Sequence, residues 1–488
     1  MSLNIDEAIL KNVVEDVLRK LGDKVSPETT SAPKPAAAIP ARKSSPDYGV
    51  FDCANEAAAA SVEGQKALRK LGFEGRKKVI DIVKTTCADK AEEWGRLELN
   101  ETKIGRLDHK IAKLVGIPNL PGVEWLTPRG MSGDHGITLE ENTPFGVVAA
   151  ITPVTHSIPT AACNIISMVA AGNGVVFNAH PGGAACAAEA VRTFNKLIES
   201  ELGIHNLITI VEHPTIDSFN ALCASEHVNL LCVTGGPGVV NAAMKSGKRA
   251  ICAGPGNPPV VVDTTADLDK AARDIIFGGA FDNNLLCIGE KQVFVLDAVY
   301  DQFLQAFKRA GAAQLNSTQL DTLTKQVFTF KEDGGGCSHP VLERELVGAD
   351  ATTLADRAGT KVPAGTEMLF AETDASHLFV QEEQMMPMIP VVRVSNMDEA
   401  IEQAAISEHG YKHSSMIHSL NVVNMGAMAR ALDSTLFVKN GACVAGLGVG
   451  GEGYSSFSIA TTTGEGITTP DTFTRRRRCV LVDNLQMY

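Results

Sequence analysis

The sequence has little positive charge and no long apolar run. Its 44 Lys and Arg against 57 Asp and Glu give a formal net charge of -13, whereas nucleic-acid binding depends on basic patches that neutralise phosphate. No run of ~20 apolar residues lacks polar, Gly or Pro interruptions, which argues against a membrane span. The start MSLNIDEAIL lacks the features of a secretory signal. We therefore expect a cytoplasmic protein that binds neither nucleic acid nor membrane.

Paired cysteine patterns are also missing. The chain has 11 Cys, an odd number, with no CxxC and no paired Cys/His spacing, so neither a disulfide framework nor a metal site is expected. A chain of 488 residues with 44% hydrophobic content can instead build roughly two or three domains with large cores. Most of its cysteines are then expected to be small buried apolar residues.

The N-terminal part divides into a helix and a linker. Apolar residues recur at every fourth position from Ile5 to Leu21, which predicts an amphipathic helix over residues 1–22. Residues 23–47 are rich in Pro, Ala and Ser and predict a flexible linker. Three roles stay open for the helix: docking on another protein, docking on its own domain, or none.

From about residue 50 onward, apolar runs alternate with helix-like segments, the pattern of an α/β fold with parallel strands. Strands are predicted at residues 146–151, 173–179, 206–211, 228–234 and 259–263. Alanine-rich helical segments lie between the first four strands, at intervals of roughly 25 to 30 residues, as in βαβ units.

Four segments could carry a site. Cys287 lies among small and polar residues before an apolar strand, a setting that suits a reactive thiol, and the loop at 252–259 offers it no obvious base. Glycines at 233–247 could hold a pyrophosphate at a helix start or only form a tight turn. Glu382 and Glu383 could bind a ribose or lie in a solvated loop. The glycine-rich loop at 446–456 could be only a surface turn.

Motifs in these segments together resemble the aldehyde dehydrogenase superfamily. They are VTGGPG at 233–238, GPGNPP at 254–259, FDNNLLCIGE at 281–290, EEQMMP at 382–387 and GVGGEGYSSFSIATTTGEG at 448–466. With TPVTHSIPT at 152–160, they are most similar to the CoA-acylating aldehyde dehydrogenases of bacterial microcompartments that process ethanolamine or propanediol. The resemblance covers residue 48 to the end, and the N-terminal helix and linker resemble the encapsulation peptides of such enzymes.

The resemblance implies an α/β architecture of several parts. These are a Rossmann-like cofactor domain over 48–254, an α/β catalytic domain over 255–445, a return to the cofactor domain over 446–488, and a β oligomerisation arm near 132–145. The arm would use the C-terminal strand at 479–484 to extend a neighbour's sheet. A homodimer or a dimer of dimers is expected, with Arg475 to Arg478 ion-paired near the subunit interface rather than freely solvated.

The resemblance also implies covalent catalysis by Cys287. The thiolate would attack the aldehyde, and the resulting thiohemiacetal would lose hydride to nicotinamide and leave a thioester. The site is expected to lower the thiol pKa through N–H dipoles or the cationic nicotinamide ring. The oxyanion would be bound by the backbone N–H of Cys287 and by His156, where many relatives have asparagine. Alternatively, His156 only packs the turn behind Pro153.

The acyl acceptor follows from a missing carboxylate. Hydrolytic relatives carry a water-activating glutamate at the position that Ala253 occupies here. Because a CoA thiolate needs less assistance than water, its absence favours acyl-CoA as the product. The expected substrates are small aliphatic aldehydes, acetaldehyde or propionaldehyde. A hydrolytic dehydrogenase that releases free acid, and an inactive cargo or scaffold protein, remain alternatives.

NAD is the expected cofactor, with coenzyme A as co-substrate. The residues that the resemblance assigns to cofactor binding are Thr152, Pro153, Asn178, Thr234, Gly235, Gly236, Gly254, Gly256 and Glu383. Asn178 stands where many relatives have a lysine, and no basic residue stands out to meet the 2′-phosphate of NADP. The helix at 1–22 would bind a shell protein and place the enzyme in the microcompartment lumen.

Overall fold

The computed structural model describes residues 47–332 and 338–483. The helix predicted at 1–22, and the linker up to residue 46, lie outside these described residues. Within the described ranges, no helix has the length and apolar character needed to cross a membrane.

The first sheet is parallel and six-stranded. Its order is β1 (Val50–Phe51), β6 (Ile208–Val211), β5 (Gly174–Ala179), β4 (Val147–Thr152), β7 (Leu230–Thr234) and β8 (Ala250–Ala253). Four of these strands lie where the apolar runs predicted them, within a few residues at each end. Every residue of β4, β5 and β6 is buried, which explains their unbroken apolar character.

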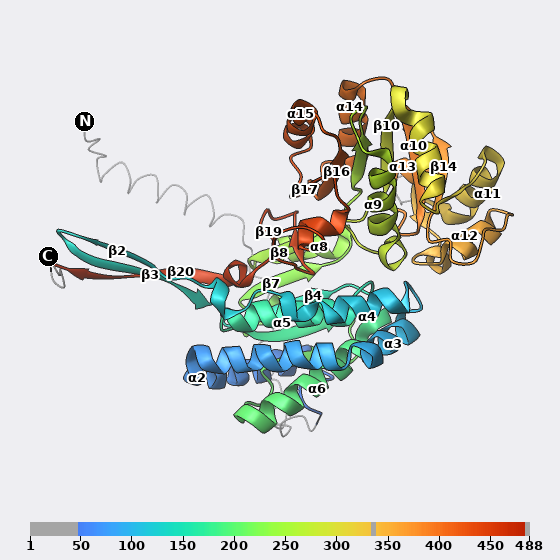
Figure 1. Cartoon of the computed structure of the whole chain (residues 1–488). Coiled ribbons are helices and arrows are strands. Elements are labelled where there is room, and N and C mark those ends of the chain that lie inside the picture. Colours follow the sequence, from blue (N-terminus) through green and yellow to red (C-terminus); the bar gives the residue numbers. More distant parts are fainter. Residues whose placement is uncertain (1–46, 333–337, 484–488) are drawn as a thin grey trace, which may run out of the picture. The chain divides into compact units, whose positions relative to one another are not determined.

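Helices flank this sheet (Figure 1). They are α2 (Ala54–Asp89), α3 (Ala91–Thr102), α4 (Leu107–Val115), α5 (Ser157–Ala170), α6 (Ala184–Leu202), α7 (Ile216–Ala224) and α8 (Pro237–Lys245). All residues of α5 are buried, because α2 packs against it in a shared core. At the start of α7, Thr215 and Ser218 form a capping box that fixes where the helix begins.

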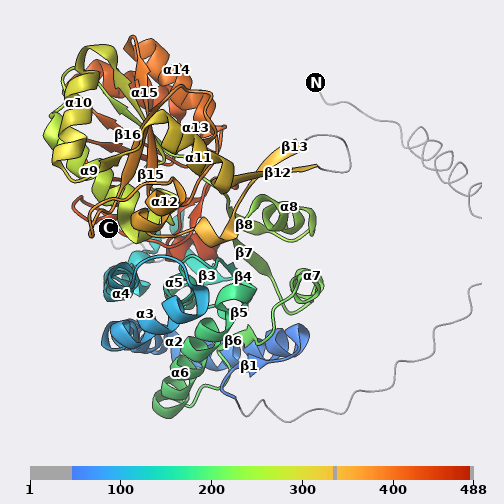
Figure 2. The same cartoon turned by 90° about the vertical axis from the view of Figure 1, so that its right-hand side faces the viewer.

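The second sheet is parallel and seven-stranded. Its order is β11 (Ala313–Gln314), β14 (Leu369–Thr373), β15 (Met388–Val394), β10 (Gln292–Leu296), β9 (Pro259–Val262), β16 (Ser414–His418) and β17 (Leu436–Lys439). Helices α9 (Leu268–Ala280) and α10 (Asp297–Arg309) pack together, as do α14 (Met397–Glu408) and α15 (Val422–Leu432). Figure 2 shows these two pairs on either side of the strands.

Near the second sheet lie α11 (Ser317–Val327), α12 (Ala351–Arg357), α13 (Leu378–Gln381) and the hairpin of β12 (Phe328–Glu332) and β13 (Ser338–Leu342). The short pair β18 (Ile459–Ala460) and β19 (Gly466–Ile467) contacts β8 of the first sheet through β18. The chain passes from the first sheet to the second between β8 and β9. The domain boundary expected at 254/255 falls in this connection and stays a prediction.

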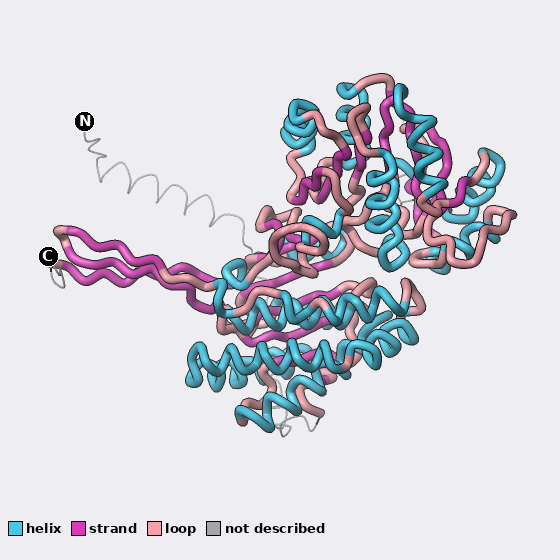
Figure 3. The backbone as a smooth tube through the Cα atoms, in the orientation of Figure 1, coloured by secondary structure: helices cyan, strands magenta, loops and turns pink. Residues whose placement is uncertain are grey.

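Three antiparallel strands form a separate ribbon, β2 (Arg129–Gly133), β3 (Gly136–Pro144) and β20 (Thr474–Val482). Figure 3 shows this ribbon extending away from the two large sheets. The predicted strand at 479–484 thus begins five residues earlier and pairs with β3 of its own chain. Arg478 Nε donates to Glu140 Oε1 over 2.9 Å within the ribbon. Extension of a neighbour's sheet remains a prediction.

Candidate active site

A cavity of about 1140 Å³ contains most of the predicted site residues. Its wall includes the ends of β4, β5, β7 and β8, the loop before β10, and the segment from Val444 to Ile459. The carboxyl ends of parallel strands are the usual place for ligands in open α/β sheets. The predicted residues in the wall are Thr152, Pro153, His156, Asn178, Thr234, Gly235, Gly236, Gly254, Cys287 and Glu383.

Gly256 is not in the cavity wall, so the structure does not place it with the predicted cofactor residues. A Cβ atom here would lie 2.6 Å from the carbonyl oxygen of Cys287 and 2.9 Å from His413 Cγ. Its backbone N–H also donates to Glu383. Gly256 is therefore required for close packing behind Cys287, since any side chain would displace the backbone of the cysteine.

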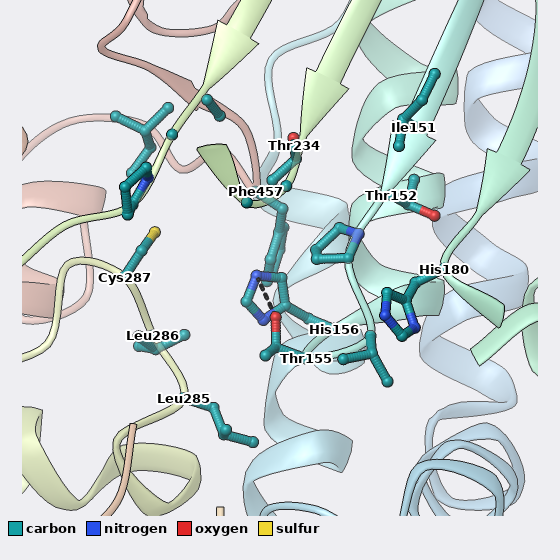
Figure 4. Close-up of a pocket in the computed structure, with 18 of the residues that line it drawn as sticks. Ile151, Thr152, Thr155, His156, His180, Thr234, Leu285, Leu286, Cys287 and Phe457 are labelled. Carbon is teal, nitrogen blue, oxygen red and sulfur yellow. Dashed lines mark hydrogen bonds between the residues drawn. The ribbon is translucent and has the colours of Figure 1, made fainter. Parts of the chain in front are cut away.

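Cys287 projects into the cavity from the loop between η4 (Phe281–Asn284) and β10 (Figure 4). Burial, and then the negative charge of Glu383, raise the pKa of this thiol to about 12. The positive charge of Lys291 and the backbone N–H groups of Cys287 and Ile288 act in the opposite direction but do not outweigh burial. The expected lowering of the pKa is therefore wrong for the protein's own groups.

His156 lies across the cavity from Cys287 (Figure 4). It is the N-cap residue of α5 and is 6% exposed. Burial, and then the positive charge of Lys113, hold its pKa well below the ordinary value, so the imidazole is neutral. Nε2 lies 3.4 Å from the Thr155 hydroxyl, and Nδ1 has no hydrogen-bond partner among the described residues. When Nε2 accepts from Thr155, Nδ1 carries the proton and can donate to a ligand.

The cavity wall is poor in carboxylates. Ala253 ends β8 and lies in the wall, so no carboxylate extends from that strand. Among the described residues of the wall, Glu383 is the only acidic one. Burial raises its pKa, opposed by the charge of Lys291 and the N–H of Gly256. Glu382 is outside the cavity wall.

The turn between β7 and α8 leaves open space along its backbone. A Cβ atom added at Gly235 would have its nearest neighbour at 3.9 Å, and one added at Gly236 would meet nothing within 4 Å. Gly236 is the N-cap of α8, which no side chain caps. The N–H of Gly235 donates to the Ala253 carbonyl over 3.3 Å, and Pro237 has no N–H. Gly236 and the following residues of the first turn of α8 therefore offer the N–H groups that fit a pyrophosphate.

The Asn178 side chain forms a hydrogen bond with the first turn of α7. Its Oδ1 atom accepts from the Ser218 hydroxyl over 2.6 Å, and this hydroxyl also belongs to the capping box at the start of α7. Asn178 is thus held in the wall by this hydrogen bond.

Sequence reasoning missed two buried lysines. Lys113 lies in the cavity wall and forms an ion pair with Asp282 of η4. Lys291 is fully buried and its Nζ donates to the carbonyl oxygen of Asn284 over 2.8 Å. Lys291 directly follows the segment FDNNLLCIGE and precedes a buried strand, and this position could have identified it as a residue near the site. Nothing in the sequence links Lys113 to a residue 169 positions away.

Comparison with known proteins agrees with this geometry. The profile of the aldehyde dehydrogenase family matches residues 48–469. The acetylating acetaldehyde dehydrogenase EutE of Salmonella typhimurium is 41% identical over 97% of this chain and 98% of its own. Among solved structures, a propionaldehyde dehydrogenase from the fucose utilisation microcompartment of Clostridium phytofermentans superposes with a TM-score of 0.87. That protein is 42% identical, over 90% of this chain and 100% of its own.

A third relative has an acylated cysteine in its crystal structure. This is the Rhodopseudomonas palustris propionaldehyde dehydrogenase with bound CoA and an acylated cysteine, which is 40% identical. Its TM-score is 0.85, over 89% of this chain and 98% of its own. These similarities extend over nearly the whole length, and the cavity with its cysteine agrees with them. The chain therefore belongs to the aldehyde dehydrogenase family.

Proposed function

We propose that this protein is a CoA-acylating aldehyde dehydrogenase that converts a short-chain aldehyde, NAD and CoA into acyl-CoA and NADH. The observation that carries the proposal is the composition of one cavity wall. Cys287 and His156 are both in it, His156 Nδ1 has no hydrogen-bond partner among the described residues, and Ala253 at the end of β8 supplies no carboxylate.

The first half of the reaction builds a thioester on the protein. The Cys287 thiolate adds to the aldehyde carbon, and the carbonyl oxygen becomes an oxyanion. His156 Nδ1–H and the backbone N–H of Cys287 donate to this oxygen and stabilise its charge. Collapse of the oxyanion expels hydride, and the bond between sulfur and carbon becomes a thioester. Bound NAD supplies the hydride acceptor, and its cationic ring favours the thiolate.

The second half transfers the acyl group to CoA. The thiolate of CoA attacks the thioester carbon, the tetrahedral oxyanion uses the same two donors, and Cys287 leaves as thiolate. Water would need a general base to attack at a comparable rate. Ala253 cannot provide one, and the partly buried Glu383 is paired electrostatically with Lys291. The acyl group therefore passes to sulfur rather than to water.

Cofactor contacts follow from the cavity wall. The Gly235–Gly236 turn would hold the pyrophosphate of NAD at the start of α8, and Glu383 would accept from the nicotinamide ribose hydroxyls. Asn178 would face the adenosine ribose with a neutral amide. NAD is proposed over NADP because Lys113 is the only lysine or arginine in the described wall, and it is already ion-paired with Asp282.

The cellular setting is proposed from the relatives and from the N-terminal sequence. Acetaldehyde and propionaldehyde are the proposed substrates, because the relatives named above act on these aldehydes. A homodimer or dimer of dimers would form through the β2–β3–β20 ribbon. The amphipathic segment at 1–22 would bind a shell protein and hold the enzyme in the lumen of a bacterial microcompartment.

One experiment tests this function against its alternatives. Purified protein is given propionaldehyde and NAD, with and without CoA, and both NADH and acyl products are quantified. We expect sustained NADH formation only with CoA, propionyl-CoA as the product, and no turnover by Cys287→Ala. Free propionate formed equally fast without CoA would establish the hydrolytic enzyme. No turnover of any aldehyde by the wild-type protein would support the inactive cargo protein.

A further inference from the structure

Three consecutive residues before Cys287 have a left-handed backbone. Asp282, Asn283 and Asn284 have φ values of 51°, 55° and 63°, and all three are buried. Residues with a Cβ atom adopt this conformation at a cost, and Asn and Asp tolerate it best. Such a turn persists only where its surroundings hold it in place, and these turns gather at functional sites.

Each of the three side chains is held by a different part of the structure. Asn283 Nδ2 donates to the carbonyl of Gly348 over 2.9 Å and to Asp350 over 2.8 Å. Asn284 Nδ2 donates to the carbonyl of Glu290 over 2.8 Å, which closes the loop around Cys287. These contacts fix the turn to its own half of the molecule.

Asp282 makes the contacts that cross to the other half. Its Oδ1 atom accepts from the Arg106 N–H over 2.8 Å, and its Oδ2 atom accepts from Lys113 Nζ. Its backbone N–H donates to His109 Nδ1 over 2.8 Å. Lys110 Nζ lies 4.0 Å from the same carboxylate. Asp282 thus attaches the cysteine loop to helix α4.

A second carboxylate continues this contact to His156. Lys110 Nζ donates to Glu98 Oε1 over 3.0 Å, and Glu98 Oε2 accepts from the Ile158 N–H over 3.0 Å. Ile158 is the second residue of α5, two positions after His156. Asp282, Lys110 and Glu98 are each at most 1% exposed. A buried chain of charges therefore connects the turn before Cys287 to the start of the helix that presents His156.

We propose that Asp282, Lys110 and Glu98 are positioning residues that fix Cys287 and His156 relative to each other across the cavity. The inference rests on the proposed function, in which these two residues act on one carbonyl carbon and its oxygen. Their separation must match a tetrahedral centre, and a displacement of about 1 Å can cost on the order of 100-fold in rate. Buried charges resist displacement strongly, because any shift leaves one of them unpaired.

The test uses Asp282→Asn and Glu98→Gln, singly and together. Asn keeps the shape of Asp282 and tolerates the left-handed backbone, so the first substitution removes mainly the charge. Asp263→Asn is the matched control, since Asp263 is equally buried and accepts hydrogen bonds from Ser419 and Asn424 away from the cavity wall. Steady-state rates, KM for NAD and melting temperatures are measured for each protein.

We expect Asp282→Asn to lower kcat about 100-fold and Glu98→Gln about 10-fold, with KM for NAD changed less than about 3-fold. The double variant should fall no more than about 3-fold below Asp282→Asn, because both substitutions break one chain. Asp263→Asn should keep kcat within about 3-fold of wild type even where its melting temperature falls equally.

The inference would be overturned by kcat near wild type in Asp282→Asn, or by losses that multiply in the double variant. A loss in Asp263→Asn that equals that in Asp282→Asn would do the same. Should Asp282→Asn fail to fold, Glu98→Gln and the paired variant Asp282→Asn with Lys113→Met carry the test, since the pair leaves no lysine unpaired there. Turnover by Cys287→Ala would instead refute the proposed function itself, which separates the two failures.

Discussion

Cys287 and the Gly235–Gly236 turn face the same cavity, but buried polar contacts surround the first and open space surrounds the second. The loop with Cys287 follows three left-handed residues whose side chains are all bonded. The glycine turn has no neighbouring atom closer than 3.9 Å to where a side chain would begin. The reacting end of the cavity is thus fixed in advance, whereas the cofactor end is shaped to let a ligand approach the backbone.

This difference suits a reaction with two large ligands. In the proposed reaction, thioester formation and acyl transfer both occur at Cys287 and need the same donors, so the geometry there must not change. The two proposed large ligands, NAD and CoA, both carry a pyrophosphate group and must each be bound and released. Substitutions near Cys287 should therefore change kcat, and substitutions in the glycine turn should change KM.

The largest effect is expected for His156→Ala. Loss of one oxyanion donor should lower kcat about 100- to 1,000-fold with KM for NAD little changed. His156→Asn restores a donor and should keep kcat within about 10-fold of wild type. Steady-state kinetics with propionaldehyde check both. Equal activity of His156→Ala and wild type would mean that His156 only packs its turn.

Next in size is the pH dependence of Cys287 alkylation. A pKa raised to about 12 leaves the neutral thiol dominant over the whole neutral range. The thiolate fraction therefore rises with pH, by about 10-fold for each unit below the pKa. Iodoacetamide labelling of the Cys287 peptide, followed by mass spectrometry without NAD, should accelerate steadily from pH 7 to pH 10. NAD should accelerate it at pH 7, and a plateau below pH 9 would contradict the account.

A smaller effect, on the product ratio, is expected when a carboxylate is introduced at the end of β8. Ala253→Glu places a general base in the cavity wall, so water should compete for the thioester. The ratio of free propionate to propionyl-CoA should rise about 10-fold at fixed CoA. Ala253→Gln is the control, because it has a similar size without a base. An equal rise in both variants would assign the effect to disturbed CoA binding.

The smallest effect is expected at the cofactor turn. A methyl group at Gly235 meets no protein atom closely, so Gly235→Ala should keep the melting temperature and raise KM for NAD about 5- to 10-fold. Gly130→Ala on β2, which also meets nothing, should change neither quantity. A lower kcat with unchanged KM would contradict the division between the two ends of the cavity.

Local patterns in the sequence predicted five of the parallel strands, and most of the predicted site residues lie in the cavity wall. Runs such as VVAAI and GVVFNA are buried throughout, and their apolar character identifies them without a structure. Cys287, Glu383 and the glycine turn were recognisable because short motifs surround them. These motifs lie at strand ends, and strand ends in parallel sheets converge on one cavity.

Long-range contacts and burial could not be predicted in the same way. The contact between Asp282 and Lys113 joins residues 169 positions apart, and no pattern in either segment predicts it. Gly256 was assigned to the cofactor from its motif, whereas its function in packing depends on His413 and the Cys287 backbone. The direction of the Cys287 pKa shift was missed because burial outweighs the favourable dipoles.

The most direct test of the account is the fate of the acyl group on Cys287. Protein is mixed with propionaldehyde and NAD without CoA, and the Cys287 peptide is examined by mass spectrometry before and after CoA is added. We predict a propionyl adduct on Cys287 that persists in buffer and is discharged to propionyl-CoA once CoA is present. Release of free propionate at the same rate with and without CoA would contradict the account.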